Sequence, residues 1–275
     1  MNPIGIMQGR LLPPSDGKIQ SFPAARWTEE FELARQAGLH CIEWIYEKPN
    51  EEKNPVRTDS GIEEMLRLSG ASGVQVKSIC ADYYMTEHLV TKDGASIRTN
   101  VDHLIWLIGQ GGKLGINYIV LPFVDSSSLA SEAEFAALAD ILVLVLPAAE
   151  ANRIELHLET DFTPKVLRAF LDRIGHPLVK ANYDIGNCAS LGHDPNEELV
   201  LLKDLLGSVH VKDRVLGGGT VPLGTGSADF ETCFRLFNAA GFSGPYILQA
   251  ARQDGMTEVE LAVQNRKLVE RFAKN

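Results

Sequence analysis

The segment Arg153-Ile-Glu-Leu-His-Leu-Glu159 is an apolar run of strand character that ends on a carboxylate. Side chains alternate between the two faces of a strand, so the two leucines share one face and Glu155, His157 and Glu159 share the other. One face is suited to packing and the other to binding or chemistry. The segment therefore predicts a strand of a buried sheet that delivers Glu159 to its carboxyl end.

The same pattern returns three times further along the chain, each time with a polar side chain where an apolar run ends and a helix signal begins. These runs are residues 179–184, 208–212 and 246–249. They place Asp184, His210 and Gln249 at or near strand ends. In a closed parallel barrel the carboxyl ends of all strands surround one cavity, so residues far apart in sequence become neighbours. A single metal site that joins them to Glu159 is the simplest explanation.

The rest of the chain alternates short apolar runs with helix signals. Strands are expected at residues 4–7, 41–44, 74–80 and 118–121, and helices at 27–37, 61–72, 97–114, 131–151 and 257–272, with further helices after Thr163-Pro164, near Pro195 and near Asp229. We expect Gly109 and Gly111-Gly112 to break the 97–114 helix. Eight strand–helix alternations without a linker predict a single (β/α)8 TIM-barrel domain over residues 1–275.

Composition limits the classes of function. The chain has 275 residues, of which 45% are apolar and 23% charged, and a formal net charge of -10 at pH 7. Nucleic-acid binding needs a clustered basic face, so this balance argues against such a partner. The four cysteines show no C-x-x-C pairing, which predicts buried thiols. Because we find no secretory signal and no apolar run of membrane-spanning length, we expect a cytoplasmic protein without a membrane partner.

Glu159, Asp184 and His210 offer two oxygen ligands and one imidazole. This set suits Mn²⁺, Mg²⁺, Co²⁺ or Zn²⁺, with Mn²⁺ as our first choice, and Gln249 would add an uncharged amide oxygen as a weaker ligand. Each residue alone would be interpreted as a polar strand end in a salt bridge. Correct parity on all four strands makes a divalent-metal site the better interpretation.

Four segments together carry a resemblance to a known family. They are His157-Leu-Glu159, Asp184-Ile-Gly-Asn187, Val209-His-Val-Lys-Asp213 and Pro222-Leu-Gly-Thr-Gly-Ser-Ala-Asp-Phe230. Over nearly the whole chain they resemble the sugar phosphate isomerase/epimerase family of xylose isomerase-like TIM barrels. The resemblance implies Glu159, Asp184 and His210 as metal ligands, Arg214 near a small sugar or sugar phosphate, and Glu43 in the pocket lining. It also implies a homodimer or homotetramer.

Two positions depart from the family pattern. The family's eighth strand usually ends in a glutamate that binds metal and serves as the second acid or base, whereas this chain has Gln249 there. Sugar epimerases of the family often carry a histidine where this chain has Asn187. An amide cannot exchange a proton near neutral pH, so epimerisation by two carboxylates is in question. By position, Gln249 still belongs with the catalytic set of Glu159 and Lys212.

The remaining chemistry follows from the residues themselves. A divalent ion chelated by a substrate carbonyl oxygen and the adjacent hydroxyl acidifies the neighbouring C–H through a metal-stabilised enediolate, and Glu159 is the expected base. Epimerisation needs a second group on the opposite face, whereas aldose–ketose isomerisation needs one base on one face. Gln249 therefore favours isomerisation, and His157, Lys212 or Asp82 would have to supply the missing acid in an epimerase.

Lys212 lies two residues after His210 and shares its inward face. It is expected either to neutralise the enediolate or a substrate anion, or to form an ion pair with Glu155 or Asp184, and both interpretations stay open. His157 also points inward and is interpreted as a hydrogen-bonded core histidine.

Candidate substrate-binding residues share a position at or just past a strand end. They are Glu43, Asp82, Asn187, Arg214 and Arg252. The arginines can hold a phosphate or carboxylate, whereas Arg10 is expected at the solvent surface. Gly217-Gly218-Gly219 is expected to form a mobile loop over the pocket mouth, and Gly224-Thr-Gly226 to cradle a phosphate.

Three other functions compete with the isomerase or epimerase interpretation. The same metal and base can expel a β-hydroxyl group, as in the similar inosose dehydratases, which would make the protein a lyase. A DNA repair enzyme of the endonuclease IV type has a similar fold but uses several zinc ions and a basic face, which seven histidines and a net charge of -10 fit poorly. The third alternative is a barrel that binds a ligand without catalysis. Gln249, in place of the family's glutamate, would then indicate a catalytic site that has decayed.

Overall fold

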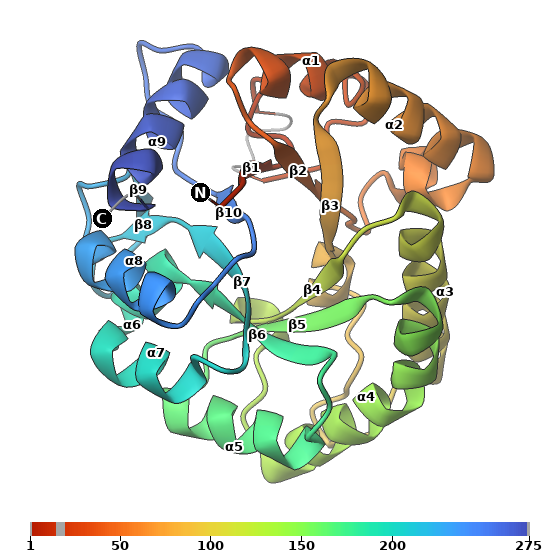
Figure 1. Cartoon of the computed structure of the whole chain (residues 1–275). Helices are drawn as coiled ribbons and strands as arrows, with labels where there is room; N and C mark the ends of the chain where they lie inside the picture. The colour runs from red at the N-terminus through yellow and green to blue at the C-terminus, as the bar shows by residue number, and fades with distance from the viewer. Residues whose placement is uncertain (1, 15–19, 274–275) are drawn as a thin grey trace.

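Eight parallel strands close into a barrel in the order β1-β10-β7-β6-β5-β4-β3-β2 in the computed structural model, which describes residues 2–14 and 20–273. The strands are β1 (Ile4–Met7), β2 (Cys41–Ile45), β3 (Gln75–Cys80), β4 (Tyr118–Phe123), β5 (Glu155–Thr160), β6 (Val179–Asp184), β7 (Leu206–Val211) and β10 (Tyr246–Leu248). Figure 1 looks along the barrel and shows the helices as an outer ring. The expected TIM barrel is confirmed.

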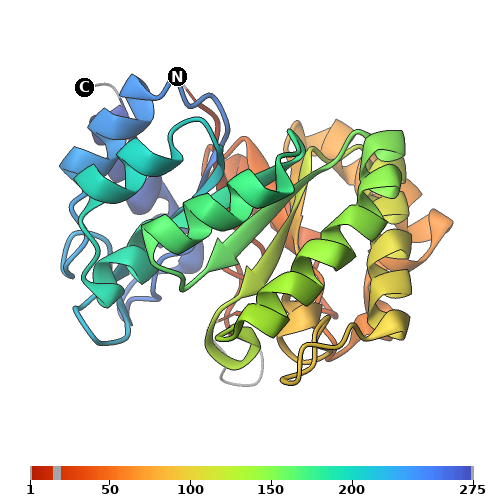
Figure 2. The ribbon, with the colours of Figure 1, turned by 90° about the horizontal axis from the view of Figure 1, so that it is seen from below.

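Helices follow the strands around the ring. They are α1 (Glu29–Gln36), α2 (Asp59–Ser72), α3 (Arg98–Leu114), α4 (Glu132–Asn152), α5 (Pro164–Ile174), α6 (Ile185–Leu191), α7 (Pro195–Leu202), α8 (Phe230–Ala239) and α9 (Glu258–Ala273), with 3-10 turns η1 (Glu51–Lys53), η2 (Pro55–Arg57), η3 (Asp82–Met85) and η4 (Asp125–Ser127) in the loops. Figure 2, a side view, shows α4 and α5 lying side by side over the strands. Within the described ranges, no helix has both the length and the apolarity needed to cross a bilayer.

The buried core lies between the strands and the helices. Leu156 and Leu158 of β5 are both fully buried, as the alternation predicts. Burial of each such leucine contributes roughly 1.5–3 kcal/mol relative to exposure. Ser131 starts α4 because its hydroxyl accepts a hydrogen bond from the Glu134 amide while the Glu134 carboxylate accepts one from the Ser131 amide.

The expected break in α3 is wrong, because the helix runs unbroken from Arg98 to Leu114. A Cβ on Gly111 would lie 2.8 Å from Cδ1 of Ile116 and 2.9 Å from Cδ1 of Ile154. This glycine therefore permits close packing and does not end the helix. An interior glycine costs about 1 kcal/mol of helix propensity, which the packed face of α3 offsets.

Two elements near the barrel mouth were not expected from the sequence. Helix α6 begins directly at the end of β6, with Asp184 as its N-terminal cap. Strands β8 (Asp213–Arg214) and β9 (Thr220–Val221) pair into an antiparallel hairpin. The three glycines expected to form a mobile loop make the turn of this hairpin, and the Gly217 amide donates to the Ser190 carbonyl of α6 at 2.8 Å.

Candidate active site

Three neighbouring strands bring Glu159, Asp184 and His210 together at the carboxyl end of the barrel. Glu159 lies near the end of β5, Asp184 ends β6, and Asp184 pairs in register with His210 of β7. One ligand atom from each of the three side chains lies within 4.8 Å of those of the other two. All three residues are buried. Such a group of two carboxylates and an imidazole can hold a divalent metal ion.

The two ring nitrogens of His210 have different surroundings. Nε2 lies 2.6 Å from Oε1 of Glu43, whose Oε2 accepts a hydrogen bond from the Ser78 hydroxyl at 2.7 Å. Nδ1 lies 3.9 Å from Oε2 of Glu159 and has no hydrogen-bond partner. Metal-binding histidines commonly use one nitrogen as ligand while the other donates to a carboxylate. Glu43 is fully buried beneath His210. Its contact with Nε2 orients the imidazole ring.

The charges of the cluster are strongly coupled. Burial raises the pKa of Glu159 to about 7, although His210 opposes the shift. Burial lowers the pKa of His210, but the carboxylates of Glu43 and Glu159 outweigh it and raise the value to about 9. Burial also disfavours ionised Asp184, yet Lys212 and His210 together hold the pKa of its carboxyl below the usual range. A cation arriving here must therefore compete with protons.

Asn187 of α6 connects the metal-capable cluster to two cations. Its Nδ2 donates to Oε1 of Glu159 at 2.9 Å, while its Oδ1 accepts from Arg214 at 2.9 Å and from Lys212 at 3.3 Å. Lys212 also lies 2.6 Å from Oδ2 of Asp184. Of the two ion pairs expected for Lys212, the structure therefore contains the one with Asp184.

Gln249 follows β10 and belongs to a chain of side-chain amides. Nε2 of Gln249 donates to Oε1 of Gln20 at 2.8 Å, and Nε2 of Gln20 donates to Oδ2 of Asp82 at 2.7 Å. Arg10 fixes this direction, because its guanidinium only donates and it donates to Oε1 of Gln20 at 3.3 Å. Oε1 of Gln249 is consequently left buried without a partner. Burial raises the pKa of Asp82.

The donor set fits a divalent cation. Two carboxylates lie close together in a buried site, where the Lys212 ammonium and the protonated His210 ring offset their charge and a metal ion could take the place of the His210 proton. His210 Nδ1 and Gln249 Oε1 are both buried and unpartnered. Oxygen and imidazole ligands of this kind suit Mg²⁺, Mn²⁺, Co²⁺ and Zn²⁺ alike.

The two arginines near the first and last strands hold loops. Arg10 is only 8% exposed and donates to the Ala250 carbonyl at 2.7 Å, so the expected surface position is wrong. Arg252 donates to the carbonyls of Gly9 and Leu12, both at 2.7 Å. These contacts tie the segment after β1 to the segment after β10, and they occupy the Arg252 guanidinium that we expected near the substrate.

The expected phosphate cradle is already filled by the protein. The amides of Gly224 and Gly226 each donate to Oδ2 of Asp213 at 2.9 Å, and the Ala228 amide donates to Oδ1 at 3.1 Å. Asp213 is fully buried there. The carboxylate takes the place of the anion that the glycine pattern predicted, so these amides are not free to hold a phosphate.

The fold and this cluster define a (β/α)8 barrel with a candidate metal centre at the carboxyl ends of its strands. A family model described as Xylose isomerase-like TIM barrel matches residues 31–271. The match covers most of the chain, and the chain belongs to the xylose isomerase-like TIM barrel family. Among its relatives, L-ribulose-5-phosphate 3-epimerase UlaE of Shigella flexneri serotype 5b (strain 8401) is 27% identical over 241 residues, covering 84% of each chain.

Solved structures share the fold at lower sequence identity. D-psicose 3-epimerase, determined in the presence of D-fructose, aligns with a TM-score of 0.78 and 14% identity, covering 99% of this chain and all of that one (100%). A xylose isomerase-like TIM barrel protein from Mycobacterium smegmatis, in complex with magnesium, aligns with a TM-score of 0.71 and 19% identity, covering 99% and 96% of the two chains. These likenesses concern the fold.

Proposed function

We propose that this chain is a divalent-metal-dependent isomerase or epimerase of a small sugar or sugar phosphate. The observation that carries the proposal is the buried group of Glu159, Asp184 and His210, whose ligand atoms lie within 4.8 Å of one another at the carboxyl ends of adjacent barrel strands. The similarity to L-ribulose-5-phosphate 3-epimerase supports a ketose or its phosphate as the substrate class.

The proposed ligands are Glu159, Asp184, His210 through Nδ1, and Gln249 through Oε1. Mn²⁺ is the first candidate because the set is mostly oxygen with one imidazole, while Mg²⁺, Co²⁺ and Zn²⁺ suit the same atoms. When bound, such an ion supplies Lewis-acid polarisation of a substrate carbonyl and stabilises the negative charge that develops on its oxygen.

Glu159 is the proposed base. Asn187 donates to its Oε1, which orients the carboxylate and leaves Oε2 on the side of His210. Oε2 is then available to remove a proton from the carbon next to the substrate carbonyl. The Lys212 ammonium, beside Asp184, lies where it would stabilise developing negative charge or hold a substrate anion.

Gln249 decides which reaction follows. A neutral amide cannot return a proton to the opposite face of the substrate, so Glu159 alone favours proton transfer on one face, and hence aldose–ketose isomerisation. Epimerisation would require another acid, and Asp82 is the candidate because it joins the Gln249 chain through Gln20 and its pKa is raised by burial.

A substrate panel with product analysis tests the proposal. Metal-loaded protein would be incubated with pentuloses, hexuloses and their 5- or 6-phosphates, and products would be separated by mass and stereochemistry. We expect an isomer of unchanged mass, and the matched variant Gln249→Glu should raise the share of epimer. A product lighter by one water would instead support a lyase, and binding without turnover would support a barrel that only binds its ligand.

A further inference from the structure

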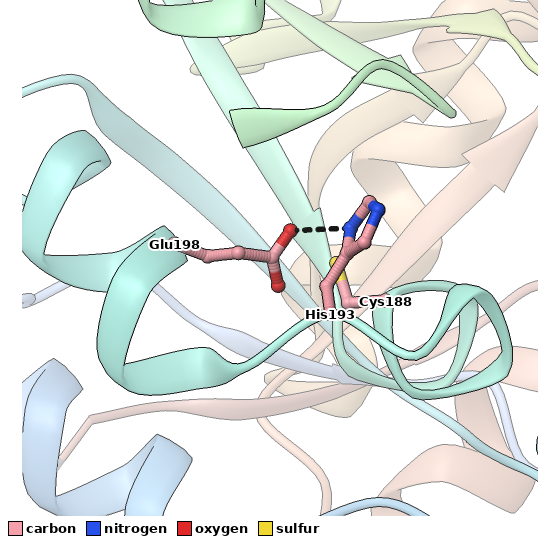
Figure 3. Close-up of side chains that lie close together, drawn as sticks. All are labelled: Cys188, His193 and Glu198. Carbon is pink, nitrogen blue, oxygen red and sulfur yellow. Dashed lines mark hydrogen bonds and ion pairs between the residues drawn. The ribbon is translucent and has the colours of Figure 1, made fainter. Parts of the chain in front are cut away.

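A second group of metal-capable side chains lies outside the site just described. Cys188 in the middle of α6, His193 in the α6–α7 loop and Glu198 of α7 each offer one ligand atom within 4.8 Å of the other two. Figure 3 shows the three side chains converging from these elements onto one point. The segment is short in sequence, yet it combines a thiol, an imidazole and a carboxylate, which are the ligand types that Zn²⁺ prefers.

The spacing of the three ligand atoms is close to what one tetrahedral ion needs. Zinc–nitrogen and zinc–oxygen bonds of about 2.0–2.1 Å place two such ligand atoms roughly 3.3 Å apart. His193 Nδ1 and Glu198 Oε1 lie 2.8 Å apart, so binding requires a small opening. A sulfur ligand, with a bond of about 2.3 Å, would stand roughly 3.6 Å from the other two atoms. The Cys188 sulfur already lies within 4.8 Å of the other two ligand atoms, so it needs to move by little more than about 1 Å.

The surroundings hold the carboxylate in place. Glu198 is only 3% exposed, and its second oxygen, Oε2, accepts a hydrogen bond from the Tyr183 hydroxyl at 2.8 Å. Oε1 is thereby directed at His193. A hydrogen bond of this kind to the outer oxygen of a ligating carboxylate is what orients such ligands in established metal sites.

A route for an ion to reach the group is also present. A cavity of about 250 Å³ is lined by Tyr183, Cys188, His193, Asp229 and Cys233, among others. Cys188 is partly exposed, whereas Cys41, Cys80 and Cys233 are buried. The surroundings raise the pKa of the Cys188 thiol well above its usual value, chiefly through desolvation, so alkylation of this partly exposed thiol needs alkaline pH.

We propose that Cys188, His193 and Glu198 form a second divalent-metal site, of the zinc type, with water in the fourth position. The ion would cross-link α6 to α7. Helix α6 also carries Asn187 and begins at Asp184, so this cross-link would brace the segment that supplies both residues to the candidate active site. The second site is distinct from the first because it alone contains a thiolate ligand.

Cobalt substitution separates the two sites. Protein freed of metal with a chelator would be titrated with Co²⁺ while the near-ultraviolet absorption of thiolate-to-cobalt charge transfer is followed. Glu159, Asp184 and His210 are oxygen and nitrogen ligands and cannot give this band, so its appearance reports a cysteine ligand, which the Cys188→Ser variant identifies. We expect the band in the wild type, in the matched control Cys41→Ser and in His210→Ala, and its loss in Cys188→Ser.

A second measurement uses the wild type alone and so does not depend on the folding of a variant. Iodoacetamide would be added with and without Zn²⁺, and the alkylated cysteines would be identified by mass spectrometry. Protection of Cys188 by Zn²⁺ supports the site. If Co²⁺ gives no charge-transfer band and Zn²⁺ leaves alkylation of Cys188 unchanged, the proposal is overturned, whatever the outcome of the sugar assays.

Discussion

The two ends of β5 carry the same kinds of side chain but pair their carboxylates and imidazoles differently. At the amino-terminal end, His157 places Nδ1 2.8 Å from the Ser208 hydroxyl and Nε2 2.9 Å from Oε2 of Glu155. Lys180 donates to the other oxygen of Glu155 at 2.7 Å. At the carboxyl end, the atoms His210 Nδ1 and Gln249 Oε1 are buried without a partner, whereas at the amino-terminal end the Tyr118 hydroxyl, whose ring stacks on His157, is a buried atom without one.

From the pairing at the two ends we infer that the amino-terminal cluster belongs to the architecture, and we propose that the carboxyl-terminal cluster binds a ligand. A cavity of about 850 Å³ opens at the amino-terminal end, lined by Glu155, Lys180 and Gly207 among others. Both carboxylate oxygens of Glu155 there are paired with His157 and Lys180. Unpartnered buried atoms are costly, and we propose that a metal ion binds those at the carboxyl end, where they lie on metal-capable side chains. The position of polar groups alone would not have separated the two ends.

The largest expected effect comes from the same substitution at both ends of the strand. Glu159→Gln removes the proposed base and should lower kcat by about 10²–10⁴-fold, the usual contribution of a general base. Glu155→Gln should leave kcat within a few-fold and lower thermal stability instead, because it weakens the pairing with His157 and Lys180. Steady-state kinetics on the best substrate and thermal unfolding of both variants provide the comparison.

A reversed pattern, with Glu155→Gln inactive and Glu159→Gln fully active, would contradict the assignment of the two ends. Circular dichroism of each variant guards against loss of fold as the cause of lost turnover.

Removing the carboxylate beneath His210 should weaken metal binding. Glu43→Gln takes away the acceptor that orients the imidazole, and such losses typically reduce metal affinity by about 10–100-fold. Ser208→Ala, which alters the hydrogen bonding of His157 at the other end, is the matched control and should leave metal affinity unchanged. Competition titration with a chromophoric chelator measures the metal affinity of both variants. Equal affinities of Glu43→Gln and Ser208→Ala would rule out a positioning role for Glu43.

Metal affinity should also depend on pH. In the metal-free protein the pKa of His210 is raised to about 9 and that of Glu159 to about 7. Since the ligands must lose these protons, affinity should rise with pH by up to about tenfold per unit between pH 7 and 9, and more steeply below pH 7. Affinity that is flat or falls with pH over this range would be inconsistent with His210 as a ligand.

The smallest effect should come from Gly207 at the amino-terminal end. A Cβ on this residue would lie 2.5 Å from Nε2 of His157, so Gly207→Ala should displace the ring and cost about 1–3 kcal/mol of stability. Metal affinity and turnover should be unchanged. Denaturant unfolding measures the change in the free energy of unfolding. A loss of turnover in Gly207→Ala as well would show that the two ends of the barrel are coupled.

The sequence predicted the barrel and its strand ends because period-2 patterns and strand–helix alternation are local signals. The inward parity of Glu159 and its meeting with Asp184 and His210 follow from closure of the barrel. Gln20 was missed because it lies in a turn-rich segment without periodicity, and only the fold brings it between Gln249 and Asp82.

Helix α6 and the filled cradle illustrate a second limit. Ile185–Leu191 is too short for a helical pattern to stand out, and its start at Asp184 depends on a side-chain cap. The Gly224-Thr-Gly226 pattern correctly indicates an anion-binding turn. The anion bound by this turn is the Asp213 carboxylate. The sequence could not show this, because it does not reveal how close Asp213 lies to the turn in the fold.

The central claim is that the carboxyl end of the barrel removes a proton next to a sugar carbonyl. The most direct measurement is deuterium incorporation by NMR when Mn²⁺-loaded protein is incubated with candidate ketoses and ketose phosphates in D₂O. We expect exchange at the carbon next to the carbonyl, lost in Glu159→Gln and after chelation and retained in Glu155→Gln. Exchange that persists unchanged in Glu159→Gln, or no exchange with any sugar by fully loaded protein, would contradict it.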